Sequence, residues 1–342
     1  MKVLVTGGCG FIGSHVCEYY RNQGAEVISF DNMTKHELKR TGFNAEAARD
    51  YIVNFEKKIG VNVVKGDIRN KEELNKVAED CDFIVHTAAQ PAMTISVEDP
   101  ELDISTNVNG TFNVLEAARK QDCPVVFCST VHVYGPDINK SLKEGPTRFT
   151  RNPPEITEDE PILQGTMTPL HASKRTGELY VRVFNETYGL KTAAYRFTGL
   201  YGPRQFGGED HGWVANFSIR TIMNRPITIY GTDKQVRDIL YATDAAAAFD
   251  AFYKTPVSGI YNVGSGTPSS ISLKECIDMI SDITKTKPEV NFAPARSGDL
   301  YYYISNISKA KKDLKWQPKV LPREGITNLI NWIKENKPIF SG

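Results

Sequence analysis

The stretch "TGGCGFIG", Thr6 to Gly13, decides how the fold of this 342-residue chain is interpreted. It places Gly7, Gly10 and Gly13 between the apolar run "KVLVT" and the amphipathic run "FIGSHVCEYYRNQG". These runs predict a strand, a tight turn and a helix that ends at Gly24. In that context the first glycine permits the turn, the second lets backbone approach a pyrophosphate, and the third lets helix and strand pack closely. The stretch therefore predicts a dinucleotide site where the N–H groups of a helix N-terminus can bind phosphate.

The alternation of short apolar runs with helical patterns continues as far as Phe197. The runs that predict strands are "EVISF", "VNVVKGD", "DFIVHTA", "PVVFCST" and "KTAAYRF". Helical patterns fall at Glu72 to Glu79, in "ISTNVNGTFNVLEAARKQD" and in "HASKRTGELYVRVFNETYG". Continuous apolar strands alternating with helices are typical of a parallel sheet covered on both faces. We therefore predict an α/β fold, a Rossmann-type doubly wound parallel sheet followed by a smaller C-terminal α/β region for substrate.

The expected domain limits follow from where this alternation weakens. Residues 1–197 form the predicted dinucleotide-binding domain, to which the chain returns at about 238–264, and residues 198–237 and 265–342 form the predicted substrate-binding domain. Met33 to Gly60 is longer than a usual connection, and its helical part "AEAARDYIVNFEKK" is interpreted as a surface elaboration. Pro136 to Thr168 lacks periodicity and is expected to be an ordered, irregular excursion.

Composition excludes several classes of partner. Lysine plus arginine equals aspartate plus glutamate, 41 of each, so no global field favours nucleic acid or anionic membranes. No apolar run reaches the roughly 20 residues that span a bilayer, and the glycine motif begins too early for a cleaved targeting segment. The six cysteines show no metal-ligand spacing, so we expect no metal site and reduced thiols in a cytoplasmic protein.

Two acids follow predicted strands and bear on the choice of cofactor. Asp31 ends the second strand, where a carboxylate can accept both adenosine ribose hydroxyls and would repel a 2′-phosphate. NAD is therefore favoured over NADP. Asp67 follows the third strand and either meets the adenine or caps the next helix.

With these residues in place, motifs along nearly the whole chain carry a family resemblance. They are "TGGCGFIGSH", "GDIRN", "HTAAQPA", "NVNGTFNVLEAAR", "CSTVHVYG", "SKRTGE", "YRFTGLYGPRQ", "RDILYATD", "ARSGD" and "LKWQPKV". The chain resembles the extended short-chain dehydrogenases/reductases of the nucleotide-sugar epimerase and dehydratase group. "RQFGGEDHGWV", "GTDKQVRD" and the long insert before "SK" are similar to the CDP-tyvelose (CDP-paratose) 2-epimerase branch.

The resemblance implies the cofactor, the reaction and a set of cofactor contacts. Enzymes of this group oxidise a sugar hydroxyl with NAD and return hydride to the opposite face of the keto-sugar. The implied cofactor-binding residues are Gly7, Gly10, Phe11, Ile12, Gly13, Asp31, Asn32, Asp67, Ile68, Ala88, Ala89, Gln90, Asn107 and Lys174.

The same resemblance implies catalytic residues, with one departure. Thr130 in "CSTVHVYG" matches the Ser/Thr that hydrogen-bonds the reacting hydroxyl, although such a residue can also cap a turn. Lys174 matches the lysine that holds the nicotinamide ribose and lowers the pKa of a tyrosine four residues earlier. That position holds Leu170, which cannot exchange a proton.

Several groups could replace the tyrosine. His132 lies two residues after Thr130, and His171 shares part of the helix face of Lys174. Tyr134, Tyr201, water, or the loss of catalysis remain open. Val131-His132 stands where related 4,6-dehydratases carry an Asp-Glu pair, so dehydration is not expected.

The substrate side is also implied by the resemblance. Arg237 and Arg296 match positions that clamp a nucleotide diphosphate, since guanidinium forks fit phosphate oxygens; the alternative is surface ion pairs with Asp238 and Asp299. The implied substrate-binding residues are Arg196, Arg204, Gln205, His211, Trp213, Arg237 and Arg296, with core packing as the alternative for Trp213. The helices Leu102 to Arg119 and Leu170 to Glu186 resemble the pair that forms the family's dimer interface, so we expect a homodimer or higher homo-oligomer.

Three functional hypotheses follow. The first is an NAD-dependent nucleotide-sugar epimerase with an atypical proton relay, acting at C2 of a CDP-sugar if the nearest branch holds. The second is a UDP-sugar 4-epimerase or related isomerase. The third is a catalytically silent protein that binds NAD and a nucleotide sugar. Retention of Thr130, Lys174 and the arginines favours catalysis, whereas Leu170 favours the third hypothesis.

Overall fold

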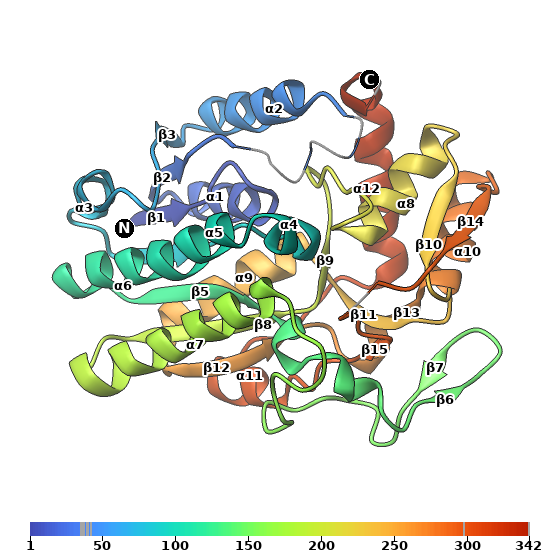
Figure 1. The fold of residues 1–342 in the computed structure, drawn as a ribbon. Coiled ribbons are helices and arrows are strands. Elements are labelled where there is room, and N and C mark those ends of the chain that lie inside the picture. The colour runs from blue at the N-terminus through green and yellow to red at the C-terminus, as the bar shows by residue number, and fades with distance from the viewer. Residues whose placement is uncertain (35–37, 39–40, 42, 297, 341–342) are drawn as a thin grey trace.

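A seven-stranded sheet forms the centre of the computed structural model, which describes residues 1–34, 38, 41, 43–296 and 298–340. Its strands run in the order β12-β8-β5-β4-β1-β2-β3, and every neighbouring pair is parallel (Figure 1). The strands are β1 (Lys2–Thr6), β2 (Glu26–Asp31), β3 (Asn62–Lys65), β4 (Phe83–His86), β5 (Val125–Thr130), β8 (Thr192–Phe197) and β12 (Gly259–Val263). The predicted Rossmann-type doubly wound sheet is confirmed.

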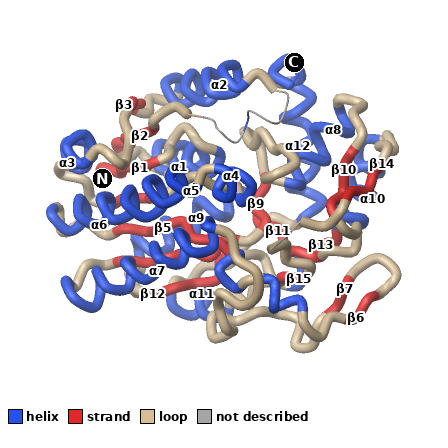
Figure 2. Tube along the Cα trace, viewed as in Figure 1, coloured by secondary structure: helices blue, strands red, loops and turns tan. Residues whose placement is uncertain are grey.

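Helices cover both faces of this sheet because successive strand side chains point to opposite sides. On one face, Val3 and Val5 pack with α1 (Phe11–Asn22), α9 (Ala242–Lys254) and α11 (Ser308–Asp313). On the other face, Leu4 packs in a second cluster with helices that follow β3, β4 and β5. These helices are α3 (Lys71–Ala78), α6 (Thr111–Lys120) and α7 (Pro169–Tyr188). In Figure 2 the strands of the main sheet accordingly lie between helices.

The expected helix from Leu102 to Arg119 is present but not uniform. It begins as α5 (Pro100–Asp103), continues through a π-helical segment η2 (Ile104–Gly110) and ends as α6. Such a segment inserts extra backbone into one turn and is frequent at functional sites. A side chain at Gly110 would meet Ile68 at 2.4 Å, so the helix lies directly against the loop that follows β3.

The smaller region is built from two short sheets and three helices. Its strands are β9 (Gly199–Tyr201), β10 (Ile227–Tyr230), β11 (Val236–Tyr241), β13 (Ser270–Ser272), β14 (Val290–Ala293) and β15 (Tyr302–Tyr303). Its helices are α8 (Trp213–Ile222), α10 (Leu273–Thr284) and α12 (Pro322–Glu335). The chain returns to the main sheet at β12, whereas β11 pairs with β9, β13 and β15.

The segment from Met33 to Gly60 differs from the expected surface elaboration. Its helix α2 (Ala45–Lys58) buries Ala48 and Ile52 in the same apolar cluster as α8 and α12. The Trp332 indole donates a hydrogen bond to Tyr51 Oη at 3.0 Å, and Figure 1 shows α2 beside the C-terminal end of the chain. The apolar stripe of α2 was visible in the sequence, but its partner lies far along the chain.

The segment from Pro136 to Thr168 is irregular, as predicted. It contains the 3₁₀ turn η4 (Pro136–Asn139) and a short hairpin, β6 (Lys143–Glu144) with β7 (Phe149–Thr150), which extends away from the body of the molecule in Figure 1. The remaining elements are α4 (Met93–Glu98), η3 (Val131–Tyr134), η5 (Thr267–Ser269) and η6 (Lys337–Phe340). None of the helices in the described residues has the length and apolar character needed to span a bilayer.

Candidate active site

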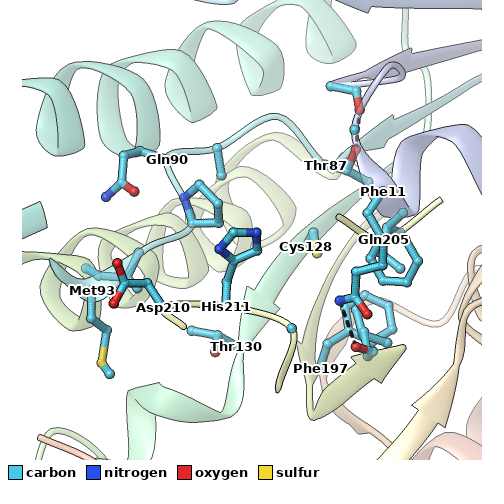
Figure 3. A pocket seen from close by; sticks show the side chains of 18 of the residues that line it. Phe11, Thr87, Gln90, Met93, Cys128, Thr130, Phe197, Gln205, Asp210 and His211 are labelled. Atoms are coloured by element: carbon cyan, nitrogen blue, oxygen red, sulfur yellow. Dashed lines mark hydrogen bonds between the residues drawn. The ribbon is translucent and has the colours of Figure 1, made fainter. Parts of the chain in front are cut away.

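A cavity of about 550 Å³ runs along the carboxyl ends of the main-sheet strands. Its lining joins the β1–α1 turn, the ends of β2, β4 and β5, helix α7, and loops of the smaller region. Figure 3 shows its interior, with Thr130, Gln90 and Met93 on one side of His211 and Phe11 and Gln205 on the other. Ligands of doubly wound folds bind at this edge of the sheet, so the cavity lies where the fold predicts a site.

The glycine turn forms one end of the cavity and fits a dinucleotide. Gly7 has φ +70°, and a Cβ there would lie 2.6 Å from the backbone nitrogen of Ala88. A Cβ at Gly13 would lie 2.1 Å from the carbonyl oxygen of Gly7, so the helix can approach the turn only with glycine at this position. Gly10 caps α1 and has no side chain, which leaves the N–H groups of the first turn accessible to phosphate.

The acids near the predicted adenosine end have different environments. Asp31 is largely buried, lines the cavity and accepts the backbone N–H of Met33 at 2.8 Å. Asp67 does not line the cavity: its carboxylate accepts the Arg69 guanidinium at 2.7 Å and the Asn32 amide at 3.1 Å. Burial alone would raise the pKa of Asp67, but these hydrogen bonds lower it to about 2. Asn70, not Asp67, caps α3, so the alternative capping role of Asp67 is wrong.

Most of the other expected cofactor residues line the same cavity. They are Gly7, Gly10, Phe11, Ile12, Gly13, Asn32, Ile68, Ala88, Ala89, Gln90 and Lys174. Asn107 does not line it, because its amide is buried in η2, donates to the Gln90 carbonyl at 3.0 Å and accepts the Gln90 N–H at 2.8 Å. It therefore holds the Gln90 loop in place. Arg69 lines the cavity and was missed, although it stands in the quoted motif "GDIRN".

Lys174 and Leu170 lie on the face of α7 that turns to the cavity. The Lys174 side chain is buried. Its amino group donates a hydrogen bond to the Cys128 carbonyl at 2.9 Å and lies 5.0 Å from the centre of the Phe127 ring. Burial lowers its pKa below that of a free lysine. Leu170 also lines the cavity, and its backbone N–H donates to Ser96 Oγ at 3.3 Å. The position of the expected phenol is thus an apolar wall beside a buried amine.

Thr130 ends β5 and begins the short helix η3 that carries His132. The Thr130 hydroxyl oxygen accepts the His132 N–H at 3.2 Å, which leaves the hydroxyl hydrogen to be donated to another acceptor. The His132 side chain lines the cavity. Burial lowers the pKa of His132 to about 3, with the positive charge of Arg237 and the His171 ring adding to the shift. The imidazole of His132 is therefore neutral, and it belongs to the segment that directly follows Thr130.

The other candidates for the missing tyrosine do not line the cavity. His171 is fully buried behind His132, with the ring centres 5.8 Å apart. Tyr134 donates to Asn262 Oδ1 at 2.7 Å, and Tyr201 is buried against Tyr241 with ring centres 5.4 Å apart. Among the candidate side chains, His132 is the one in a position to meet a ligand.

Six of the seven expected substrate residues line the cavity: Arg204, Gln205, His211, Trp213, Arg237 and Arg296. The guanidinium of Arg204 is held by α1, where it pairs with Glu18 at 2.6 Å and donates to Ser14 Oγ at 3.1 Å. Arg296 lies over the Tyr230 ring, 3.7 Å from its centre, and pairs with Asp210 at 3.2 Å instead of the expected alternative Asp299. Arg237 is surrounded by protein, and burial lowers its pKa to about 10. Asp238 accepts Thr198 Oγ1 and the N–H groups of Ser265 and Gly266.

Arg196 is the exception among the expected substrate residues. Its guanidinium donates to both Glu178 oxygens at 2.8 Å and to Tyr134 Oη at 3.0 Å, and only 3% of its surface is exposed. Alternation along β8 turns this side chain toward α7 and away from the cavity. The expected substrate contact of Arg196 is therefore replaced by a structural ion pair.

Comparison with known proteins places the chain in a family. The NAD dependent epimerase/dehydratase family model matches residues 3–264. The chain is 32% identical to the CDP-paratose 2-epimerase of Salmonella typhi, covering 97% of this chain and 99% of that protein. It is also 32% identical to a putative UDP-glucose 4-epimerase of Methanocaldococcus jannaschii, covering 98% and 99%.

Solved structures agree with these sequence relatives. A UDP-glucose 4-epimerase of Thermus thermophilus in complex with NAD superposes with a TM-score of 0.79 at 33% identity, covering 98% of this chain and 99% of that one. A UDP-glucose 4-epimerase of Thermotoga maritima with UDP-glucose gives a TM-score of 0.82 at 28% identity, covering 98% and 100%. The chain belongs to the NAD dependent epimerase/dehydratase family, so the expected family and its cofactor, NAD, are confirmed.

Proposed function

We propose that this protein is an NAD-dependent nucleotide-sugar epimerase that oxidises a sugar carbon and reduces it again from the opposite face. One observation carries the proposal: a single cavity joins the glycine turn, the Thr130–Lys174 pair and the arginines Arg237 and Arg296. A silent binder of NAD would not need a hydroxyl donor between the cofactor end and the diphosphate end. Similarity to CDP-paratose 2-epimerase supports C2 of a CDP-sugar as the site of inversion, and similarity to UDP-glucose 4-epimerases supports the alternative.

Each group in the cavity has a proposed task. Bound NAD would supply the hydride chemistry at the sugar carbon, as acceptor in the first step and donor in the second. The glycine turn holds the pyrophosphate, Asp31 the adenosine ribose and Lys174 the nicotinamide ribose. Arg237 and Arg296 hold the sugar-nucleotide diphosphate through guanidinium–phosphate hydrogen bonds. Thr130 and His132 make hydrogen bonds to the oxygen of the carbon that reacts, in place of the phenol that Leu170 lacks.

Isotope retention tests the reaction type. A nucleotide sugar deuterated at the inverted carbon should keep its deuterium in the epimerised product, because the hydrogen removed is returned to the same carbon. Proton NMR of the product in ordinary water measures this directly. Washout of the deuterium into solvent would mean that the carbon is deprotonated, which contradicts an epimerisation by hydride transfer.

Restoring the tyrosine tests whether the wild type has a working site. We expect Leu170→Tyr to change kcat by less than about ten-fold, since Thr130 and His132 already act on the reacting oxygen. Leu170→Phe controls for the added ring without a hydroxyl. A gain of about a hundred-fold or more with tyrosine alone, the scale of one acid–base group, would support a silent binder that has lost its relay.

Asp31 is expected to set the preference for NAD. Asp31→Ser removes the charge that repels a 2′-phosphate, so the ratio of NADP to NAD dissociation constants should fall by about ten-fold or more. Calorimetric titration with both cofactors measures this ratio. Asp67→Ser is the matched control, because Arg69 and Asn32 already occupy its carboxylate. An unchanged ratio in Asp31→Ser would assign the preference to other residues.

A homodimer or higher homo-oligomer is also proposed, through the outer faces of η2, α6 and α7. Large apolar side chains there are exposed by 37–54%: Ile104, Phe112, Leu179, Tyr180, Val183 and Tyr188. Exposed apolar patches of this kind are typical of protein interfaces. Val183→Asp should yield monomers in light scattering after size exclusion, whereas Val257→Asp, equally exposed outside this patch, should not. A monomeric wild type would contradict the proposal.

A further inference from the structure

The hydrogen bonds of His171 determine which of its ring nitrogens carries a hydrogen. The backbone N–H of Thr168, just before α7, donates to His171 Nδ1 at 3.0 Å, and Thr168 Oγ1 lies 2.8 Å from the same atom. A backbone N–H can only donate, so Nδ1 of His171 accepts and carries no hydrogen. Burial lowers the pKa of His171, which keeps the ring neutral. Neutral His171 therefore carries its hydrogen on Nε2.

That hydrogen and one nitrogen of His132 lack partners. Within the described part of the chain, His171 Nε2 and His132 Nδ1 are both buried without a hydrogen-bond partner. A buried donor or acceptor without a partner is unfavourable and uncommon, so two such atoms in neighbouring rings are unlike an ordinary core. The two ring centres lie 5.8 Å apart, with the ring planes at 87°. Rings at this separation can be linked by one bridging water or by a change of ring orientation.

We infer that His171 is a positioning residue whose Nε2–H group, directly or through one water, serves Nδ1 of His132 and fixes the tautomer of the His132 ring. A nitrogen that accepts a hydrogen bond cannot carry the ring hydrogen, so neutral His132 carries it on Nε2. This nitrogen is the one that faces the cavity, because only Nδ1 of His132 belongs to the buried, unpartnered atoms. His132 thus presents an N–H donor to the ligand.

The consequence for catalysis rests on the proposed function. The Thr130 hydroxyl, whose oxygen already accepts the His132 N–H, and the His132 Nε2–H group are two donors from one short segment. Donors directed at a carbonyl oxygen stabilise the keto-sugar and the negative charge that develops when it is reduced. His132 then acts as a neutral hydrogen-bond donor, and the proton of the sugar hydroxyl passes to water when hydride leaves the carbon and is taken up from water again when the keto-sugar is reduced. The positive charge of Arg237 also disfavours the imidazolium form of His132, because two like charges repel each other.

Histidine tautomers can be measured without any turnover. In the full-length protein with bound NAD, labelled with ¹⁵N and ¹³C in its six histidines, the ring nitrogen and Cδ2 shifts report the tautomer of each ring. His132→Gln identifies the His132 signals by their loss. We expect His132 and His171 to be neutral with hydrogen on Nε2 at neutral pH. An Nδ1–H tautomer or an imidazolium at His132 would overturn the inference.

Two substitutions at His171 separate positioning from packing. His171→Gln keeps an amide donor and, as the third residue of α7, can still accept the Thr168 N–H as a capping-box glutamine does. His171→Phe keeps only the ring. For His171→Phe we expect mixed tautomers of His132 and a fall in kcat of roughly ten-fold with little change in KM. For His171→Gln we expect the His132 tautomer and the kinetics of the wild type.

The outcomes remain distinguishable from a failure of the proposed function. An unchanged His132 tautomer in His171→Phe would overturn the inference even if activity fell. If the wild type turns over no nucleotide sugar, the proposed function fails while the tautomer is still measured. The signals of His86, held between Thr6 and Thr111 hydroxyls, should stay unchanged in each variant and report an intact fold.

Discussion

Glu178→Gln is expected to lower the free energy of unfolding by about 3–5 kcal/mol, the usual result of removing one partner of a buried ion pair. Glu178 is fully buried and accepts four hydrogen bonds, from Ser129 Oγ, from Arg175 and twice from Arg196. With glutamine there, Arg196 stays buried in an environment where its charge is no longer compensated. Urea unfolding, monitored by circular dichroism in the presence of NAD, measures the change.

Glu186→Gln is the matched control for this prediction. It makes the same change on the same helix, but its partner Arg182 and Glu186 itself are more than half exposed. Exposed pairs of this spacing contribute about 0.3–0.5 kcal/mol, so this variant should be almost as stable as the wild type. Equal effects at the two positions would contradict the structural role assigned to the Glu178–Arg196 pair.

Thr130→Val is expected to lower kcat by about a hundred- to a thousand-fold, which is the cost of one donor to the reacting oxygen. Valine keeps the shape of threonine but loses the hydroxyl, and it also leaves the His132 N–H without its 3.2 Å acceptor. Steady-state kinetics with saturating NAD measure the change. Thr130→Ser keeps the hydroxyl and should retain most of the activity. A fully active Thr130→Val would contradict the role proposed for Thr130.

Local patterns were sufficient for the main sheet and the cofactor end. The inner strands β1, β2, β4, β5 and β8 are short runs rich in apolar residues, because a parallel strand covered on both faces is buried along most of its length. The edge strand β3 is apolar only at its centre, Val63 and Val64. The glycines of the β1–α1 turn have a local reason as well, since any larger residue at Gly13 would collide with the carbonyl oxygen of Gly7, six residues earlier in the same turn. Such features depend on neighbours along the chain, so spacing reveals them.

Other features depend on contacts between distant segments and could not be predicted. Nothing near Arg196 in the sequence indicates that Glu178 lies opposite it on α7. From the sequence alone, an arginine is equally compatible with a phosphate ligand and with a buried ion pair. The same holds for α2, whose partner in α12 is hundreds of residues away. Asn107 was expected at the cofactor because its motif matched, yet the π-helical turn directs its amide to Gln90.

The replacement of the tyrosine shows both the reach and the limit of sequence reasoning. The spacing to Lys174 revealed that Leu170 stands at the expected position, and the candidates His132, His171, Tyr134 and Tyr201 could be named but not ranked by geometry. Tertiary structure separates them, because His132, just after β5, lines the cavity, whereas His171, Tyr134 and Tyr201 are buried and do not line it. A residue type predicts which chemistry is available, whereas burial decides whether a ligand can meet it.

Incubation of the purified protein and NAD with CDP-, UDP-, dTDP- and GDP-sugars, followed by NMR of the sugar, tests the central claim most directly. The proposed function predicts that one nucleotide sugar is converted to its epimer at a single carbon, and the coupling constants of the ring protons identify that carbon. If one of these sugars binds tightly while none is converted, the claim of an epimerase is contradicted, and Leu170 marks a protein that binds NAD and a nucleotide sugar without chemistry.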